Sequence, residues 1–100
     1  MKVIFRSTIK VVPGKMAEYM EIDKKSEAMA RRYGMSPWKR YGCLSGDSIH
    51  TIVYDTEFDS LAALEASFEK MFADPERQAL VAQSDGLIVS HENELLMPMQ

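Results

Sequence analysis

Five side chains of this 100-residue sequence carry groups suited to binding or transforming an organic molecule. They are His50, Arg6, Arg40, Trp38 and Tyr54. His50 lies in the run 49–54 (IHTIVY), the most strand-like stretch of the chain, and alternation places its imidazole on the same face as Ile52 and Tyr54. Because an imidazole can accept and release a proton near neutral pH, we predict that His50 is the catalytic proton-transfer group.

The preceding β-prone run, 37–44, contributes an indole and a second guanidinium group. A three-residue hairpin loop at 45–47 (SGD) pairs Trp38 with Tyr54, and one face then holds Trp38, Arg40, Gly42, His50, Ile52 and Tyr54. Such a face suits a planar or anionic ligand, so we predict Trp38, Arg40 and Tyr54 as substrate-binding residues. A two-residue loop would instead present Lys39, Tyr41 and Cys43, and the sequence leaves both registers open.

Arg6 is the fourth predicted substrate-binding residue. It lies in the middle of a strand-like run between apolar neighbours, where a guanidinium needs a carboxylate, a ligand or solvent. The alternative role for Arg6 is an ion pair at an interface. The alternative for His50 is a core histidine whose ring nitrogens bond to neighbours, and Trp38 and Tyr54 can equally be packing residues.

Several function classes have no support in the sequence. Phosphate-binding loops, dinucleotide fingerprints, serine-hydrolase elbows and zinc-protease motifs are absent, and two histidines with one cysteine (Cys43) predict no metal site and no bound cofactor. Residues 1–40 sum to +6 and residues 41–100 to −9, which disfavours nucleic acid as a partner. No apolar run approaches the length of a membrane span or signal peptide, so we expect a cytoplasmic protein.

Hydrophobic periodicity predicts the elements that position these residues. Alternation indicates strands over 2–12, 37–44, 48–56 and 87–97. Helical spacing indicates helices over 15–33 and from Asp59 or Ser60 to Phe72, and the Asp74-Pro75 pair predicts a short helix over 76–83. The order is that of a ferredoxin-like split βαβ fold: a single α+β domain, 1–100, whose four-stranded antiparallel sheet carries two main helices on one face.

The second face of that sheet needs its own cover. The first, third and last predicted strands carry apolar residues on both parities, and a chain of this length has no third layer to cover them. We therefore predict a homodimer joined through the sheet face.

Three short segments carry a family resemblance: residues 11–15 (VVPGK), 57–65 (EFDSLAALE) and 73–76 (ADPE). They resemble the dimeric α/β-barrel superfamily, and within it the NIPSNAP-type small proteins. The resemblance implies a homodimer whose two sheets form a barrel, with a cavity for a small molecule. Relatives include cofactor-free monooxygenases, haem-degrading monooxygenases and lactone isomerases. Trp38, His50, His91 and Asn93 lie on other strands than the haem-degrading pattern requires.

Two functions follow as expectations. The first is a small-molecule enzyme, a cofactor-independent monooxygenase or isomerase acting on an aromatic or anionic compound, with His50 moving the proton. The second is a non-catalytic NIPSNAP-like binding or regulatory module in which the same residues serve structure. An open cavity lined by these residues favours the enzyme, and solid packing around them favours the module.

Overall fold

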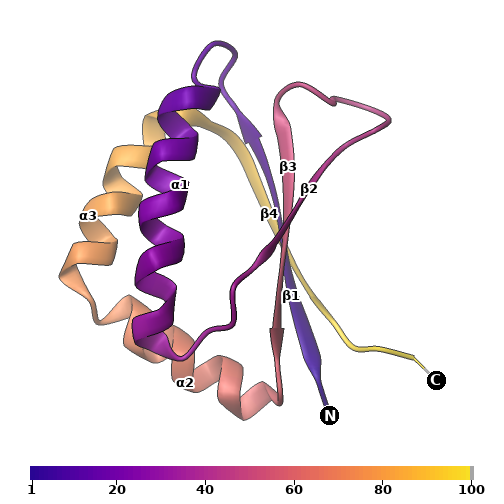
Figure 1. Cartoon of the computed structure of the whole chain (residues 1–100), viewed down its shortest axis with the longest axis vertical. Coiled ribbons are helices and arrows are strands. Elements are labelled where there is room, and N and C mark those ends of the chain that lie inside the picture. The colour runs from indigo at the N-terminus through magenta and orange to yellow at the C-terminus, as the bar shows by residue number, and fades with distance from the viewer. Residues whose placement is uncertain (100) are drawn as a thin grey trace.

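Four strands form one antiparallel sheet, and three α-helices cover one of its faces (Figure 1). The computed structural model describes residues 1–99. The strands are β1 (Val3–Val11), β2 (Lys39–Gly42), β3 (Thr51–Phe58) and β4 (Ile88–Leu96). The helices are α1 (Met16–Ala30), α2 (Leu61–Phe72) and α3 (Pro75–Ser84), with short 3-10 turns at Arg31–Tyr33 and Asp85–Leu87. The predicted α+β class and ferredoxin-like architecture are confirmed.

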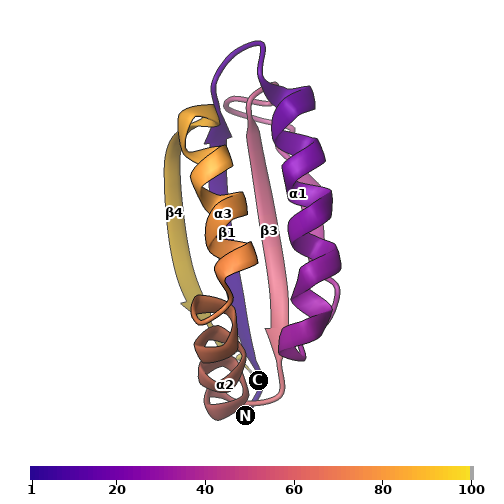
Figure 2. The ribbon, with the colours of Figure 1, turned by 90° about the vertical axis from the view of Figure 1, so that its left-hand side faces the viewer.

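The strand order is β2-β3-β1-β4, so β1 and β3 form the centre of the sheet. Residues of odd number in β1 and even number in β3 face the helices, and Ser7 pairs with Tyr54 on that inner face. Figure 2 shows α1 and α3 lying side by side over the sheet, with α2 at one end. The helix layer and the inner face of the sheet thus enclose a space between them.

The helix boundaries follow from local capping chemistry. Ser60 is the N-cap of α2, because its side chain accepts a hydrogen bond from Ala63 N at 3.0 Å. Asp74 caps α3 in the same way, with Pro75 at the first helical position. Gly34 ends the Arg31–Tyr33 turn with a φ of 78°, a left-handed conformation that favours glycine. The sequence-based boundaries of these helices agree with the structure to within a few residues.

The hairpin between β2 and β3 differs from both predicted registers. Arg40 pairs with Tyr54 and Gly42 with Ile52, so the strands are shifted by two residues from the three-residue-loop prediction. A shift of two keeps the face of each side chain, and Trp38 and Arg40 therefore still share the inner face with Tyr54. The predicted register was therefore wrong, whereas the predicted shared face of Trp38, Arg40 and Tyr54 is the one observed.

No helix or strand among residues 1–99 covers the outer face of the sheet. It carries apolar side chains, including Ile4, Tyr41, Val53 and Leu96, among paired charges. The Arg6 guanidinium donates to both carboxylate oxygens of Asp55, at 2.8 and 2.9 Å, and Lys2 pairs with Glu57 at 2.7 Å. Arg6 and Lys2 are thus paired with carboxylates of the same face, whereas Lys39, Glu92 and Glu94 of this face form no ion pair among residues 1–99.

Candidate functional site

A cavity of about 610 Å³ lies between the helix layer and the inner face of the sheet. All three helices and the strands β1, β3 and β4 contribute to its lining. Its wall is mainly apolar, with a small number of polar and charged side chains among aromatic ones. This composition is typical of a site for a small organic molecule.

One end of the cavity is formed by four phenylalanines, Phe5, Phe58, Phe68 and Phe72, which we call the phenylalanine cluster. Phe68 is at its centre, with ring centroids 5.0 Å from Phe5, 6.1 Å from Phe58 and 5.9 Å from Phe72. The pairs meet edge to face, the arrangement that aromatic quadrupoles favour. The cluster supplies a rigid surface against which a flat apolar ring can pack.

A charged network supports the wall near β2 and β3. Arg40 Nε donates to Asp23 Oδ2 at 2.8 Å, and Arg40 Nη2 donates to Glu27 Oε1 at 2.9 Å. The same guanidinium carbon lies 5.8 Å from the ring centres of both Trp38 and Tyr54. Arg40 therefore ties α1 to the two aromatic rings that line the cavity.

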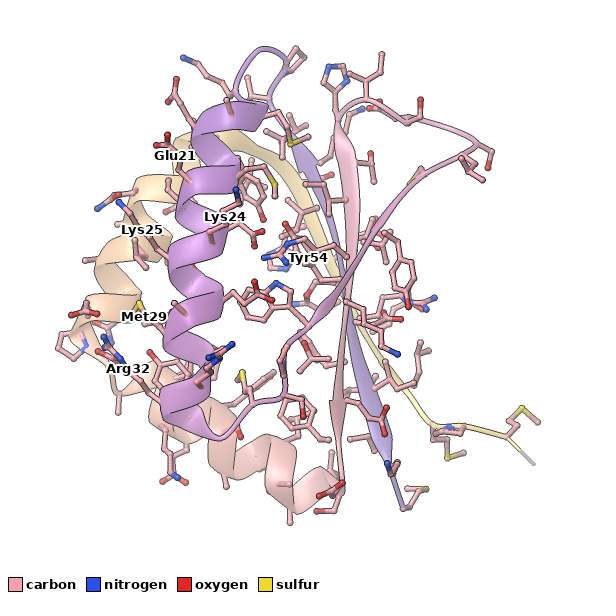
Figure 3. All side chains as sticks on the ribbon, viewed as in Figure 1. Glu21, Lys24, Lys25, Met29, Arg32 and Tyr54 are labelled. Carbon is pink, nitrogen blue, oxygen red and sulfur yellow. The ribbon has the colours of Figure 1, made fainter. Side chains whose placement is uncertain are left out.

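The buried groups of this network have shifted pKa values. Burial raises the pKa of the Asp23 carboxyl, and the hydrogen bond and charge of Arg40 offset that rise only in part. Burial also raises the pKa of Tyr54 and of Tyr19, whose hydroxyl groups lie 3.4 Å apart. Both phenols therefore remain protonated at neutral pH. Tyr54 is seen between α1 and the sheet in Figure 3.

A second polar group lines the cavity on β1 and β4. Ser7 Oγ donates to Asn93 Oδ1 at 2.9 Å, and His91 precedes Asn93 by two positions on the same face of β4. All three side chains line the cavity, and His91 and Asn93 are open to solvent at this edge of the sheet. They combine an imidazole, an amide and a hydroxyl, which can exchange a proton with a ligand and hydrogen-bond its oxygen atoms.

The structure gathers only part of the predicted site. Trp38 and Tyr54 line the cavity, and Arg40 contacts both from behind. Arg6 lies on the outer face with Asp55, so its side chain does not reach the cavity. Arg6 thus forms an ion pair within the chain, and the interface location that the alternative gave to such a pair stays a prediction.

His50 does not lie on the predicted wall. It precedes β3 in a turn where Asp47 Oδ1 accepts hydrogen bonds from the backbone N–H groups of Ile49 and His50 and lies 3.2 Å from His50 Nδ1. The side chain of His50 is not part of the cavity lining. The predicted placement was wrong because the carboxylate of Asp47 organises a turn from residues with a high strand propensity.

Among the cavity residues that the sequence did not predict as site residues, Asp23, Arg77, His91 and Asn93 carry an ionisable or amide side chain. Strand alternation in 87–97 places His91 and Asn93 on one face, which is a usable sequence signal. Arg77 and Val81 lie four residues apart on one side of α3, but only the packing of α3 shows that this side faces the cavity.

The described residues contain neither a metal-binding cluster nor a membrane-spanning helix. Residues 1–99 contain no cluster of three or more His, Cys, Asp or Glu side chains that could hold a metal ion. None of the helices among them is long and apolar enough to cross a membrane.

Comparison with known proteins identifies the family. The family model described as NIPSNAP matches residues 7–100. The chain belongs to the NIPSNAP family. A solved NIPSNAP family protein from Agrobacterium tumefaciens is 21% identical with a TM-score of 0.80, covering 98% of this chain and 86% of that one. A NIPSNAP domain protein from Burkholderia xenovorans is 25% identical with a TM-score of 0.72, covering 99% and 95%. No curated protein sequence matches this NIPSNAP chain.

A third solved structure extends the likeness beyond the family. SnoaB from Streptomyces nogalater, described as a cofactor-independent oxygenase, is 17% identical to this NIPSNAP chain with a TM-score of 0.74. The match covers 99% of this chain and 94% of SnoaB. At this identity the likeness shows a common fold, and the resemblance predicted from the three short segments is confirmed at that level.

Proposed function

We propose that this NIPSNAP protein binds a small, largely apolar organic molecule in the cavity between its helices and its sheet. The observation that carries this proposal is the cavity itself, about 610 Å³ in volume, lined by aromatic rings with a few polar groups among them. Trp38 and Tyr54, predicted from the sequence as ligand-binding residues, contribute to its lining.

We further propose that the protein transforms this ligand as a cofactor-independent oxygenase or isomerase. SnoaB, an oxygenase of that kind, has the same fold, which makes the reaction class a reasonable assignment. His91 replaces His50 as our candidate for the proton-transfer step, because His91 lines the cavity and His50 does not. Asn93, held by Ser7 at 2.9 Å, is placed two residues away to hydrogen-bond an oxygen atom of the ligand.

A non-catalytic binding module is the second candidate. It is favoured by the position of His50, which serves a turn with Asp47 rather than the cavity. Incubation with 1-naphthol in air, followed by mass spectrometry, separates the two. Conversion by the wild type and not by H91A supports the enzyme, and a bound but unchanged probe supports the module.

A larger side chain at Val81, on the rim of the cavity, tests whether the ligand enters and binds there. Val81 lines the cavity yet is 41% exposed, so a larger side chain fits there without disturbing the buried core. We expect V81F to weaken binding of the neutral probe 2-naphthamide at least tenfold, measured by calorimetry. The matched control is V89F, at an exposed β4 position outside the cavity lining, which should bind like the wild type. Equal binding by both variants would argue against the cavity as the binding site.

The homodimer predicted from the sequence is also part of the proposal. The outer face of the sheet carries Ile4, Val53 and Leu96, and Arg6 on this face is already paired with Asp55, so a second copy can cover the face without leaving Arg6 unpaired. Light scattering at micromolar concentration should give twice the chain mass of 11.4 kDa. A monomer would refute the dimer while leaving the cavity proposal intact. The cytoplasmic location stays a prediction, which cell fractionation would test.

A further inference from the structure

Arg77 is a cation of the cavity wall that has no anionic partner among residues 1–99. It lines the cavity from the third position of α3, and none of the ion pairs within those residues includes it. A guanidinium that is withdrawn from water is costly unless a carboxylate or similar group accepts its hydrogen bonds. The protein itself does not supply that group within the part of the chain described.

The carboxylates closest to Arg77 along the chain or around the cavity either bind other groups or, in the case of Asp85, lie farther along the helix. Glu76, next to Arg77 in the chain, pairs with Arg32 at 2.8 Å. Asp74 accepts a hydrogen bond from the Tyr33 hydroxyl at 2.6 Å and caps α3 through Glu76 N at 3.0 Å. Asp23 accepts from Arg40. Asp85 follows Arg77 by eight residues, which corresponds to about 12 Å along a helix axis at 1.5 Å per residue.

The electrostatic surroundings of Arg77 agree with the lack of an anionic partner among residues 1–99. Burial lowers the pKa of the Arg77 guanidinium, and no carboxylate among residues 1–99 counters that shift. Arg77 is half-buried, so water screens its charge less than at an exposed position and an anionic ligand is attracted to it.

The backbone that carries Arg77 is well held. The junction between α2 and α3 is fixed by Gln78 Nε2, which donates to Phe72 O at 2.8 Å, and by the Asp74 cap that Tyr33 supports. A guanidinium on such a backbone can bind a carboxylate through two parallel hydrogen bonds. Arg77 is also only five positions from Phe72, a member of the phenylalanine cluster on the same cavity wall.

We propose that Arg77 binds the carboxylate of an aromatic carboxylic acid whose ring packs against the phenylalanine cluster. This inference rests on the proposed binding function and narrows it to one ligand class. The cation and the aromatic surface belong to one cavity, so a single molecule with a flat ring and a carboxylate can satisfy both.

The test compares 2-naphthoate with 2-naphthamide, two probes with the same ring that differ in charge. Calorimetry at neutral pH should show that the wild type binds 2-naphthoate at least tenfold more tightly than 2-naphthamide. R77Q should reduce this ratio to about one while binding 2-naphthamide as the wild type does. The matched control is R31Q, which removes the same charge from an exposed position and should keep the wild-type ratio.

A second variant protects the test against misfolding of R77Q. R77K keeps the charge and loses the planar pair of donors, so its ratio should lie between those of the wild type and R77Q. A wild-type ratio near one, or an unchanged ratio in R77Q or R77K, would overturn the assignment of Arg77 while leaving the cavity as a site for neutral ligands. Failure of the wild type to bind either probe would overturn the proposed function and this inference together.

Discussion

Replacing Arg40 by Gln is expected to lower the free energy of unfolding by about 3 kcal/mol at neutral pH. The variant leaves Asp23, whose side chain is only 5% exposed, without its cationic partner. Removing one member of a buried ion pair costs roughly 3–5 kcal/mol, and the 28% exposure of Arg40 places this case at the lower end. For a domain of this size the melting temperature should fall by about 12–20 °C, measured by circular dichroism.

The loss caused by R40Q should depend on pH in a defined direction. Without Arg40 the pKa of the Asp23 carboxyl rises further, because the hydrogen bond and the charge that lower it most are gone. A carboxyl whose pKa is higher in the folded than in the unfolded protein destabilises the fold once the pH exceeds its ordinary value. The difference between wild type and variant should therefore shrink as the pH falls through the folded-state pKa of Asp23.

Two further variants control this prediction. D23N/R40Q removes the stranded charge and should recover part of the lost stability at neutral pH. R6Q breaks the pair with Asp55, but the Arg6 side chain is 40% exposed, so its cost should be under about 1 kcal/mol. Equal losses in R40Q and R6Q, or a loss in R40Q that does not change with pH, would contradict the assigned role of Arg40.

Replacing Phe58 by Ala should cost about 3–5 kcal/mol of stability. Phe58 is 5% exposed and packs against the core and against Phe68, so its removal takes away buried apolar surface and leaves a void. Because Phe58 also lines the ligand cavity, the void enlarges that cavity. Denaturant unfolding measures the stability, and a shift in preference towards larger aromatic probes measures the change in volume.

Phe72 offers the matched control for that substitution. It belongs to the same phenylalanine cluster but is 66% exposed, so F72A should cost under about 1 kcal/mol. Similar losses of stability for F58A and F72A would mean that Phe72 is buried in solution, for example by another molecule. The exposed surface around Phe72 would then have to be treated as an interface.

The elements of the fold were predictable because their signals are local. Ser60 and the Asp74-Pro75 pair mark helix starts through hydrogen bonds within the next few residues, whatever the rest of the chain does. The alternation in residues 3–11 likewise predicts which side chains of β1 face the core, because the pleat has a fixed period of two.

The hairpin register was not predictable, because one side chain decides it. Residues 49 and 50 have the composition of a strand, yet the Asp47 carboxylate binds the backbone N–H groups of both, and β3 begins only at Thr51. Competition between a side chain and the strand ladder for the same donors is a matter of geometry that composition does not reveal.

The candidate site was predictable only in part, because a cavity joins elements that are distant in sequence. Trp38 and Tyr54 were found since both lie in one hairpin. Arg77 and His91 reach the same cavity from α3 and β4, and their proximity depends on how the helix layer packs on the sheet. His50 was predicted because it lies in the strongest strand signal of the chain, although strength of propensity says nothing about position relative to a cavity.

The central claim is that the helix–sheet cavity binds an organic molecule, and backbone amide NMR during titration with 2-naphthamide tests it most directly. The account predicts that the largest shifts occur at cavity residues of the sheet, α1 and α3, such as Ser7, Ser26 and Val81. Outer-face residues of the same strands, such as Thr8 and Val53, should shift little. Shifts confined to the outer face, or no saturable shifts at all, would contradict the claim.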